Sequence, residues 1–167
     1  MHSISKRWID MLRLESHPEG GYFREIYRAE GVIAQPSLPL RYNGGRAYAT
    51  TIYYLLNSGE YSSLHRLQSD EQWFHLDGSA LTIHSIDPEG NYTPYHIGKD
   101  LEKGEMPHAV IPRGCWFGGT IDQANSFSLV GCFVAPGFDF DDFELAQRAE
   151  LLKKFPQHKD IITKLTK

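Results

Sequence analysis

The chain has 167 residues, of which 41% are hydrophobic and 23% charged, a composition typical of a folded globular protein. Its formal net charge is −4 with the eight histidines neutral, which argues against non-specific nucleic-acid binding, because such binding needs a basic surface. The sequence has no apolar run of about 18 residues, so no membrane span is expected. Residues 1–8 lack a signal-peptide core, and two cysteines, Cys115 and Cys132, are expected to be buried thiols. Together these features predict a cytoplasmic protein.

The N-terminal segment predicts a helix over about 4–14, followed by a turn. The apolar side chains of this helix fall on one face: Ile4, Trp8, Met11 and Leu12. The sequence His17-Pro18-Glu19-Gly20-Gly21 then breaks the helix, and its paired glycines predict a turn with unusual backbone angles. Residues 31–45 contain several glycines and prolines and are expected to form a surface loop.

Seven short segments rich in Tyr, Ile, Thr and Val come next, with turns between them. Each predicts a β-strand: about 46–57, 60–66, 71–76, 80–87, 91–97, 108–112 and 126–135. Strands at a spacing of roughly ten residues are typical of an all-β sandwich or barrel. Because no helix separates them, a parallel α/β sheet is not expected. The barrel should therefore occupy about 46–136.

The C-terminal segment returns to helical spacing, so we expect short helices within about 142–166. Its apolar positions are Phe143, Ala146, Ala149 and Leu152, and then Ile161, Ile162 and Leu165 beyond Pro156. No internal repeat or long linker divides the chain. We expect a single domain over 1–167.

A candidate pocket follows from strand geometry if 60–66 and 71–76 form an antiparallel hairpin around the turn at 67–70. The register then pairs three sets of residues: His65 with Glu71, Ser63 with Trp73, and Tyr61 with His75. Side chains alternate along a strand, so all six would share one face, with opposite Cβ atoms about 5 Å apart. An aromatic wall with several titratable groups is the composition expected of a small-molecule site.

Two spaced motifs resemble the signatures of the cupin superfamily. The first is Gly59-x5-His65-x-Leu67-x3-Glu71-x6-Gly78, and the second is Pro112-x-Gly114-x2-Phe117. In the usual cupin signatures, positions 67 and 117 are histidines. The two motifs therefore indicate a cupin scaffold from which two of the usual metal donors have been lost.

Longer motifs resemble one branch of that superfamily, often called Cupin 5. The opening is residues 17–25, HPEGGYFRE, the ending is residues 136–145, PGFDFDDFEL, and segments 63–66 and 70–73 lie between them. This resemblance implies a double-stranded β-helix barrel, or jelly roll, with short N- and C-terminal helices. It also implies a homodimer and a bacterial-type cytoplasmic protein. It carries no particular activity over to this chain.

The ligand count argues against a metal cofactor. A catalytic transition-metal site normally takes three protein ligands, and the signatures supply only His65 and Glu71. His75 lies four residues beyond Glu71, about 13 Å along a strand, and cannot join them on one ion. No cofactor is therefore expected. The alternative is a transition metal on His65 and Glu71 with a third ligand from elsewhere, such as His17.

We expect a small-molecule ligand in the barrel, and one hypothesis is a metal-independent sugar epimerase-like or isomerase-like enzyme. His65 would be the base, Glu71 would orient its ring, and a tyrosine such as Tyr53 or Tyr61 would return the proton. Tyr53 and Tyr54 are adjacent, so only one of them can face inward. The alternatives are a non-catalytic ligand-binding cupin and a metal-dependent cupin enzyme with a degenerate ligand set.

Seven residues are expected to bind the substrate: Tyr61, Ser63, Trp73, His75, Phe117, Arg24 and Arg66. An arginine can grip a phosphate or carboxylate with two hydrogen bonds. The competing interpretation for Arg24, Arg28 and Arg66 is a salt bridge to a nearby carboxylate such as Glu19, Glu25 or Asp139. A further set, Phe138, Phe140 and Phe143, is expected to pack in the core or in a dimer interface.

Overall fold

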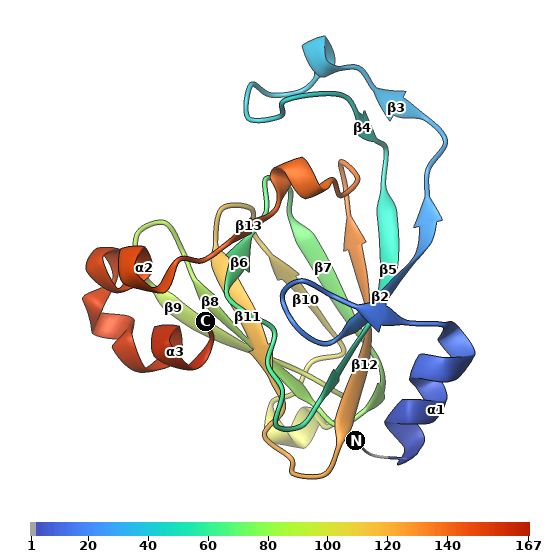
Figure 1. Ribbon diagram of the computed structural model, residues 1–167, viewed down its shortest axis with the longest axis vertical. Helices are drawn as coiled ribbons and strands as arrows, with labels where there is room; N and C mark the ends of the chain where they lie inside the picture. The colour runs from blue at the N-terminus through green and yellow to red at the C-terminus, as the bar shows by residue number, and fades with distance from the viewer. Residues whose placement is uncertain (1–2) are drawn as a thin grey trace.

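The computed structural model describes residues 3–167, and most of its strands form two antiparallel sheets packed as a β-sandwich (Figure 1). The six-stranded sheet has the order β1 (Glu15–Ser16), β2 (Tyr22–Arg28), β5 (Thr50–Asn57), β12 (Phe127–Val134), β7 (Glu71–Gly78) and β10 (His108–Ile111). The five-stranded sheet has the order β13 (Glu144–Leu145), β6 (His65–Arg66), β11 (Trp116–Thr120), β8 (Leu81–Ile86) and β9 (Tyr92–Ile97). This architecture confirms the predicted all-β fold.

The core lies between the two sheets, and strand alternation explains its composition. Along β7 the side chains of Glu71, Trp73 and His75 are buried, while Phe74 and Leu76 on the opposite face are exposed. The other inner strands contribute apolar side chains to the same core, among them Leu56, Ile83, Phe117 and Val130. Polar groups on the inner face of β7 are therefore surrounded by hydrocarbon.

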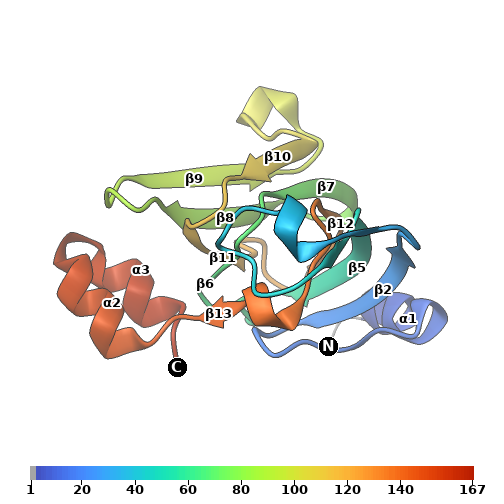
Figure 2. The ribbon, with the colours of Figure 1, turned by 90° about the horizontal axis from the view of Figure 1, so that it is seen from above.

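Short helices flank the sandwich on opposite sides, α1 (Ser3–Leu12) near β2 and β5, and α2 (Arg148–Lys154) and α3 (Lys159–Lys164) beside the five-stranded sheet (Figure 2). The first helix ends earlier than the expected position 14, because Arg13 has a positive φ of 53°. No helix starts at 142, since Phe140–Asp142 forms a 3₁₀ turn and β13 then pairs with β6. Within residues 3–167, no helix is long and apolar enough to cross a membrane.

Two of the longer strands, β2 and β11, were absent from the sequence prediction. β2 is mostly exposed and does not alternate buried with exposed side chains, and β11 contains the consecutive glycines Gly118 and Gly119, which are unfavourable in strands. Gly118 is required there, since a Cβ would lie 2.5 Å from the Ser62 carbonyl oxygen. The sheets consequently run from Glu15 to Leu145, a wider range than 46–136.

The expected hairpin between 60–66 and 71–76 is wrong. β6 pairs with β11 and β13, with His65 opposite Phe117, whereas β7 pairs with β12 and β10. Both edges of β7 are occupied, so the chain crosses from one sheet to the other at 67–70. His65 and Glu71 therefore reach the interior from opposite sheets and are not neighbours across a hairpin.

A two-stranded arm, residues 30–48, projects beyond the sandwich and contains β3 (Val32–Ile33), the 3₁₀ helix Gln35–Ser37 and β4 (Arg46–Ala47) (Figure 1). Its base is held by a buried bidentate ion pair in which Arg46 Nε and Nη2 each lie 2.7 Å from a carboxylate oxygen of Asp142. The Tyr42 hydroxyl also lies 2.8 Å from the Ser69 hydroxyl. These contacts fix the arm beside one end of the sandwich.

Candidate functional site

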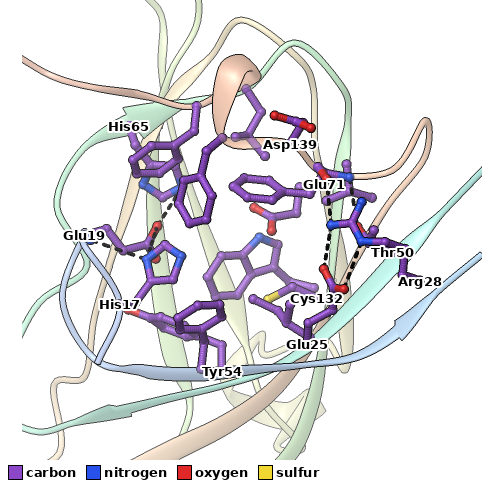
Figure 3. Close-up of a pocket in the computed structure, with 18 residues that line it drawn as sticks. His17, Glu19, Glu25, Arg28, Thr50, Tyr54, His65, Glu71, Cys132 and Asp139 are labelled. Atoms are coloured by element: carbon purple, nitrogen blue, oxygen red, sulfur yellow. Dashed lines mark hydrogen bonds and ion pairs between the residues drawn. The ribbon is translucent and has the colours of Figure 1, made fainter. Parts of the chain in front are cut away.

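A cavity of about 230 Å³ lies between the two sheets and holds most of the buried titratable groups of the core (Figure 3). The titratable groups in its interior are His17, Glu19, His65 and Glu71, together with Tyr54 and Cys132, while Glu25, Arg28 and Asp139 lie at its rim. The remaining surface is largely hydrocarbon and aromatic, including Phe23, Ile52, Leu67, Trp73 and Val134. A mostly apolar cavity with a few converging polar groups is the usual form of a small-molecule site.

The turn at His17–Gly21 carries Glu19 into this cavity. Gly20 and Gly21 have φ values of +116° and +68°, which confirms the predicted unusual backbone. A Cβ on Gly20 would lie 2.3 Å from the Tyr61 carbonyl oxygen. The Ser63 amide donates to the Glu19 carbonyl at 2.8 Å, and the Tyr54 hydroxyl donates to the Gly20 carbonyl at 2.9 Å. The two glycines therefore allow the turn to pack closely against Tyr54 and the Tyr61–Ser63 backbone.

The His65 imidazole is buried, and its hydrogen bonds define its tautomer. Nδ1 lies 2.8 Å from the Ser63 carbonyl oxygen, which can only accept, so Nδ1 carries the proton. Nε2 lies 3.3 Å from Oε2 of Glu19. Burial lowers the pKa of His65 to about 4, and the hydrogen bond to Ser63 opposes this only in part. The ring is therefore neutral at pH 7, with Nε2 as its basic nitrogen.

Glu19 connects His65 to His17. Its Oε2 also lies 3.4 Å from His17 Nδ1, and its Oε1 accepts a hydrogen bond of 2.8 Å from the Ser62 hydroxyl. Burial raises the pKa of Glu19, and the positive form of His17 opposes that rise. Burial lowers the pKa of His17, which Glu19 opposes. We call His17, Glu19 and His65 the histidine wall, since Glu19 Oε2 lies between a ring nitrogen of each imidazole (Figure 3).

Glu71 and Trp73 differ, because their polar atoms have no partner. Both are buried, and neither Glu71 Oε2 nor Trp73 Nε1 has a hydrogen-bond partner within the described part of the chain. Burial raises the pKa of Glu71 to about 8, and the nearby Glu19 carboxylate adds to the rise. The Trp73 indole opposes it without meeting Oε2 in hydrogen-bond geometry. We call these two residues the β7 wall.

The rim of the cavity is formed by an ion pair and an aromatic cluster. Arg28 binds both carboxylate oxygens of Glu25, at 2.9 and 2.7 Å, and donates to the Phe138 carbonyl at 3.1 Å. Phe138, Phe140 and Phe143 also line the cavity, with ring centroids 5.0 to 6.2 Å apart. The expectation that these phenylalanines serve only packing is therefore incomplete, since they form part of the cavity lining.

The structure brings together three of the residues expected at the site and separates the others. His65, Glu71 and Trp73 line the cavity, and Phe117 packs on the His65 ring with centroids 4.2 Å apart. The other expected side chains, Tyr61, Ser63, His75, Arg24 and Arg66, do not line it. The nearest titratable partner of His65 is Glu19, where sequence reasoning placed Glu71.

Strand geometry explains these displacements. Tyr61 packs with the core under the C-terminal helices, and His75 Nε2 lies 3.1 Å from the Ser79 carbonyl oxygen at the far end of β7. Ser63 contributes its carbonyl oxygen to His65. Arg66 binds Glu144 at 2.7 Å, and Arg24 donates to the Leu12 carbonyl at 3.0 Å. The two arginines lie on outward-facing positions, so they bind neighbouring groups of the protein surface.

Sequence reasoning missed Glu19 and Tyr54 as cavity residues. Tyr54 is 1% exposed and faces inward, whereas its neighbour Tyr53 faces the outer side of the sheet. The signal for Glu19 was present in the HPEGG segment, whose paired glycines indicated a tight turn. The sequence does not indicate that Glu19 lies near His65, because the two residues are 46 positions apart and nothing local shows which strand the turn packs against.

The residues at the cupin metal positions do not fit a transition metal. Leu67 lines the cavity as hydrocarbon, and Phe117 covers one face of His65. His65 Nδ1 is bound to Ser63, and Nε2 is directed at Glu19, not at Glu71. In residues 3–167, no group of three or more His, Cys, Asp or Glu side chains is arranged to hold a metal ion.

Comparison with known proteins places this chain in a family. The model of the cupin superfamily family DUF985 matches residues 6–146. The crystal structure of protein SO0799 from Shewanella oneidensis is 42% identical, with a TM-score of 0.88 over 100% of this chain and 98% of that one. A hypothetical protein from Leishmania major is 35% identical, with a TM-score of 0.87 over 97% and 98% of the two chains.

More distant relatives agree with this placement. The uncharacterized yeast protein YML079W of Saccharomyces cerevisiae is 28% identical over 90% of this chain and 79% of its own length. Oxalate decarboxylase from Bacillus subtilis is 16% identical, with a TM-score of 0.53 over 90% of this chain and 36% of that one, a likeness of fold alone. The chain belongs to the cupin superfamily, in the family DUF985.

Proposed function

We propose that this cupin binds a small molecule between its sheets and transfers a proton on it without a transition metal, as an isomerase or epimerase does. The observation that supports this most directly is the pair of opposite pKa shifts inside one cavity. Burial leaves His65 neutral, with a pKa of about 4, and keeps Glu71 protonated, with a pKa of about 8. Two titratable groups whose environments push their pKa values apart are suited to act as base and acid.

The base is the unit formed by His65 and Glu19. The Ser63 carbonyl holds the proton of Nδ1, so an incoming proton goes to Nε2. That nitrogen lies 3.3 Å from Glu19 Oε2, so the carboxylate stabilises the imidazolium as it forms. Glu19 thus takes the orienting role that sequence reasoning gave to Glu71. The acid is Glu71, which reaches the cavity from the opposite sheet.

A second candidate function, ligand binding without catalysis, is favoured by the amount of apolar lining. Phe23, Trp73, Phe138 and Phe143 could hold an apolar ligand by packing alone. Under this alternative, His65 would only hydrogen-bond the ligand. The two functions differ in whether a bound carbon exchanges its proton with water.

Proton exchange tests the proposal. The purified protein is incubated in D₂O with a panel of three- to six-carbon ketoses, aldoses and small ketones, and deuterium uptake next to the carbonyl is followed by NMR. We expect exchange with at least one compound. In His65→Asn the exchange rate should fall by about 10²-fold or more, which is the usual loss when a general base is removed. Phe133→Leu, on the outer face of the six-stranded sheet and away from the cavity, is a control that should exchange normally. Binding of panel members without exchange would contradict the proposal and favour the second candidate.

We also propose a homodimer in a reducing compartment such as the cytoplasm. Several apolar side chains on and beside the arm are exposed, namely Ile26, Tyr27, Val32 and Tyr48, and a second copy would cover them. Cys115 and Cys132 are both unpaired buried thiols, which fits a reducing environment. Light scattering at micromolar concentration should give twice the monomer mass of 19.1 kDa, and a monomer mass would contradict the dimer.

A further inference from the structure

Three buried polar atoms on β7 have no partner among residues 3–167, namely Glu71 Oε2, Trp73 Nε1 and His75 Nδ1, and the first two belong to residues that line the cavity. Glu71 and Trp73 are two residues apart on β7, so their side chains project from the same face. They are 7% and 2% exposed, and neither Glu71 Oε2 nor Trp73 Nε1 is hydrogen-bonded to any residue from 3 to 167. Buried polar atoms are normally paired, because an unpaired one carries the full cost of lost hydration. Two unpaired atoms facing one cavity indicate a ligand atom that would pair them.

We propose that Glu71 and Trp73 form a two-donor site for one oxygen of the substrate, and that the substrate is an uncharged carbonyl compound with a flat, apolar body. The inference rests on the proposed function, because it names the substrate class of the same cavity. An indole N–H can only donate, and a protonated carboxyl also has a donor O–H. A carbonyl oxygen has two lone pairs and accepts from both donors at once.

The remaining lining indicates the body of the substrate. Phe138, Phe140 and Phe143 form a continuous aromatic cluster, and the His17 and Phe23 rings meet edge to face at 4.5 Å on another part of the lining. Such faces favour a flat ring that can stack or meet them edge to face. The composition of the cavity lining therefore suits a cyclic or aromatic ketone better than an extended polar sugar.

The charges at the rim argue against an anionic substrate. Arg28 is the only cationic side chain among the described lining residues that carries a permanent charge, and both oxygens of Glu25 already hold it. Asp139 lines the same rim and adds negative charge. An anion would have to displace Glu25 from Arg28 and approach two carboxylates, so an uncharged molecule is favoured.

The residues of the cavity are sufficient for the proposed proton transfer, without a further reactant. The His65–Glu19 unit removes a proton from the carbon next to the carbonyl, and the electron pair of that C–H bond forms the C=C bond. The carbonyl π pair moves to the oxygen, where the Trp73 N–H and the Glu71 O–H stabilise the new negative charge. Donors aimed at a developing oxyanion in a dry site are a large source of rate enhancement. Return of the proton to carbon restores the carbonyl, with no oxidant or reductant needed.

Phenols test the oxygen site without a known substrate, because a phenol places one oxygen acceptor on a flat ring. Binding of phenol and 4-nitrophenol is measured by calorimetry against toluene, which has the ring without the oxygen. We expect both phenols to bind more tightly than toluene, because toluene offers no oxygen to the two donors. Trp73→Phe and Glu71→Leu should each weaken phenol binding about 5-fold to 10-fold. Trp116→Phe, a buried tryptophan outside the cavity, should leave it unchanged.

An NMR titration of the wild-type protein tests the same site without relying on variants, which can fail to fold. The Trp73 indole N–H resonance should move downfield on phenol addition, and the Trp116 resonance should not. Equal binding of toluene and phenol, or an unmoved Trp73 resonance at saturation, would overturn the oxygen site, whatever the result of the D₂O exchange experiment. Phenol binding that depends on both donors, with no exchange of any carbonyl compound, would support the oxygen site and leave only the proposed catalysis contradicted.

Discussion

The two walls of the cavity are equally buried but differ in how their polar atoms are paired. In the histidine wall, Glu19 Oε1 accepts a hydrogen bond from Ser62, and Oε2 lies within 3.4 Å of a ring nitrogen of each imidazole, so the carboxyl has a donor within the protein. In the β7 wall, Glu71 Oε2 and Trp73 Nε1 have none among residues 3–167. A paired buried group contributes to stability, whereas an unpaired one costs stability unless a ligand completes it. The histidine wall therefore stabilises the fold, whereas the β7 wall offers its polar atoms to a ligand.

The largest difference between the two walls is expected when leucine replaces the glutamate of each one. Glu19→Leu removes the partner of Ser62, His17 and His65 and is expected to destabilise the protein by about 2–3 kcal/mol. Glu71→Leu removes an unpaired buried carboxyl and is expected to stabilise it by about 1–2 kcal/mol. Chemical denaturation of the two variants beside the wild type measures both. Destabilisation of equal size by the two substitutions would show that the walls do not differ.

The pH dependence of folding stability should also distinguish the two walls, because Glu71 and His65 have pKa values shifted in opposite directions. Glu71 has a pKa of about 8 in the folded protein against an ordinary 4.5, so the folded state holds a proton that the unfolded chain has released. Its contribution to stability is therefore lost as pH rises toward 8. The pKa of His65 is shifted the other way, to about 4 from 6.5. His65 therefore makes the folded state more stable as the pH rises from 4 to 6.5, and its contribution is constant above pH 6.5. Between pH 6.5 and 8 the wild type should lose on the order of 2 kcal/mol.

The Glu71→Gln variant isolates the source of this slope. Glutamine keeps the size of the side chain and cannot ionise, so most of the loss between pH 6.5 and 8 should disappear. Glu19, whose pKa is also raised, would leave a residual slope of the same sign. Denaturation curves at several pH values measure the difference, and an unchanged slope in the variant would assign the effect to another group.

The smallest effect is expected at the rim. The ion pair between Arg28 and Glu25 is solvent-exposed, with side chains 44% and 37% accessible, so its contribution to stability should be below about 1 kcal/mol. Arg28→Gln should shift the denaturation midpoint only slightly and less in 1 M salt than at low salt. A loss approaching that of Glu19→Leu would mean that the rim is as tightly coupled to the fold as the histidine wall.

Much of the fold was predictable from local signals, because β-branched and aromatic runs between turns are direct signatures of strands. The glycine-bounded motifs also contain two residues, His65 and Glu71, that line the cavity. Their relationship was mistaken, since which strand pairs with which depends on contacts distant in sequence. β6 is only two residues long, and β11, its partner, was hidden by two glycines. Glu19 was missed for the same reason, because its position depends on a turn packed against Tyr61 and Ser63.

The protonation state of His65 is the most direct test of the account, and it needs no ligand. Nitrogen-15 NMR of histidine-labelled protein reports the proton on each ring nitrogen, with His65→Asn used to assign the signals. The account predicts a neutral His65 ring at pH 7 with the proton on Nδ1, facing Ser63, and no titration until the pH falls toward about 4. A His65 ring that titrates near 6.5, or carries protons on both nitrogens at pH 7, would contradict the assignment of the His65–Glu19 unit as the base.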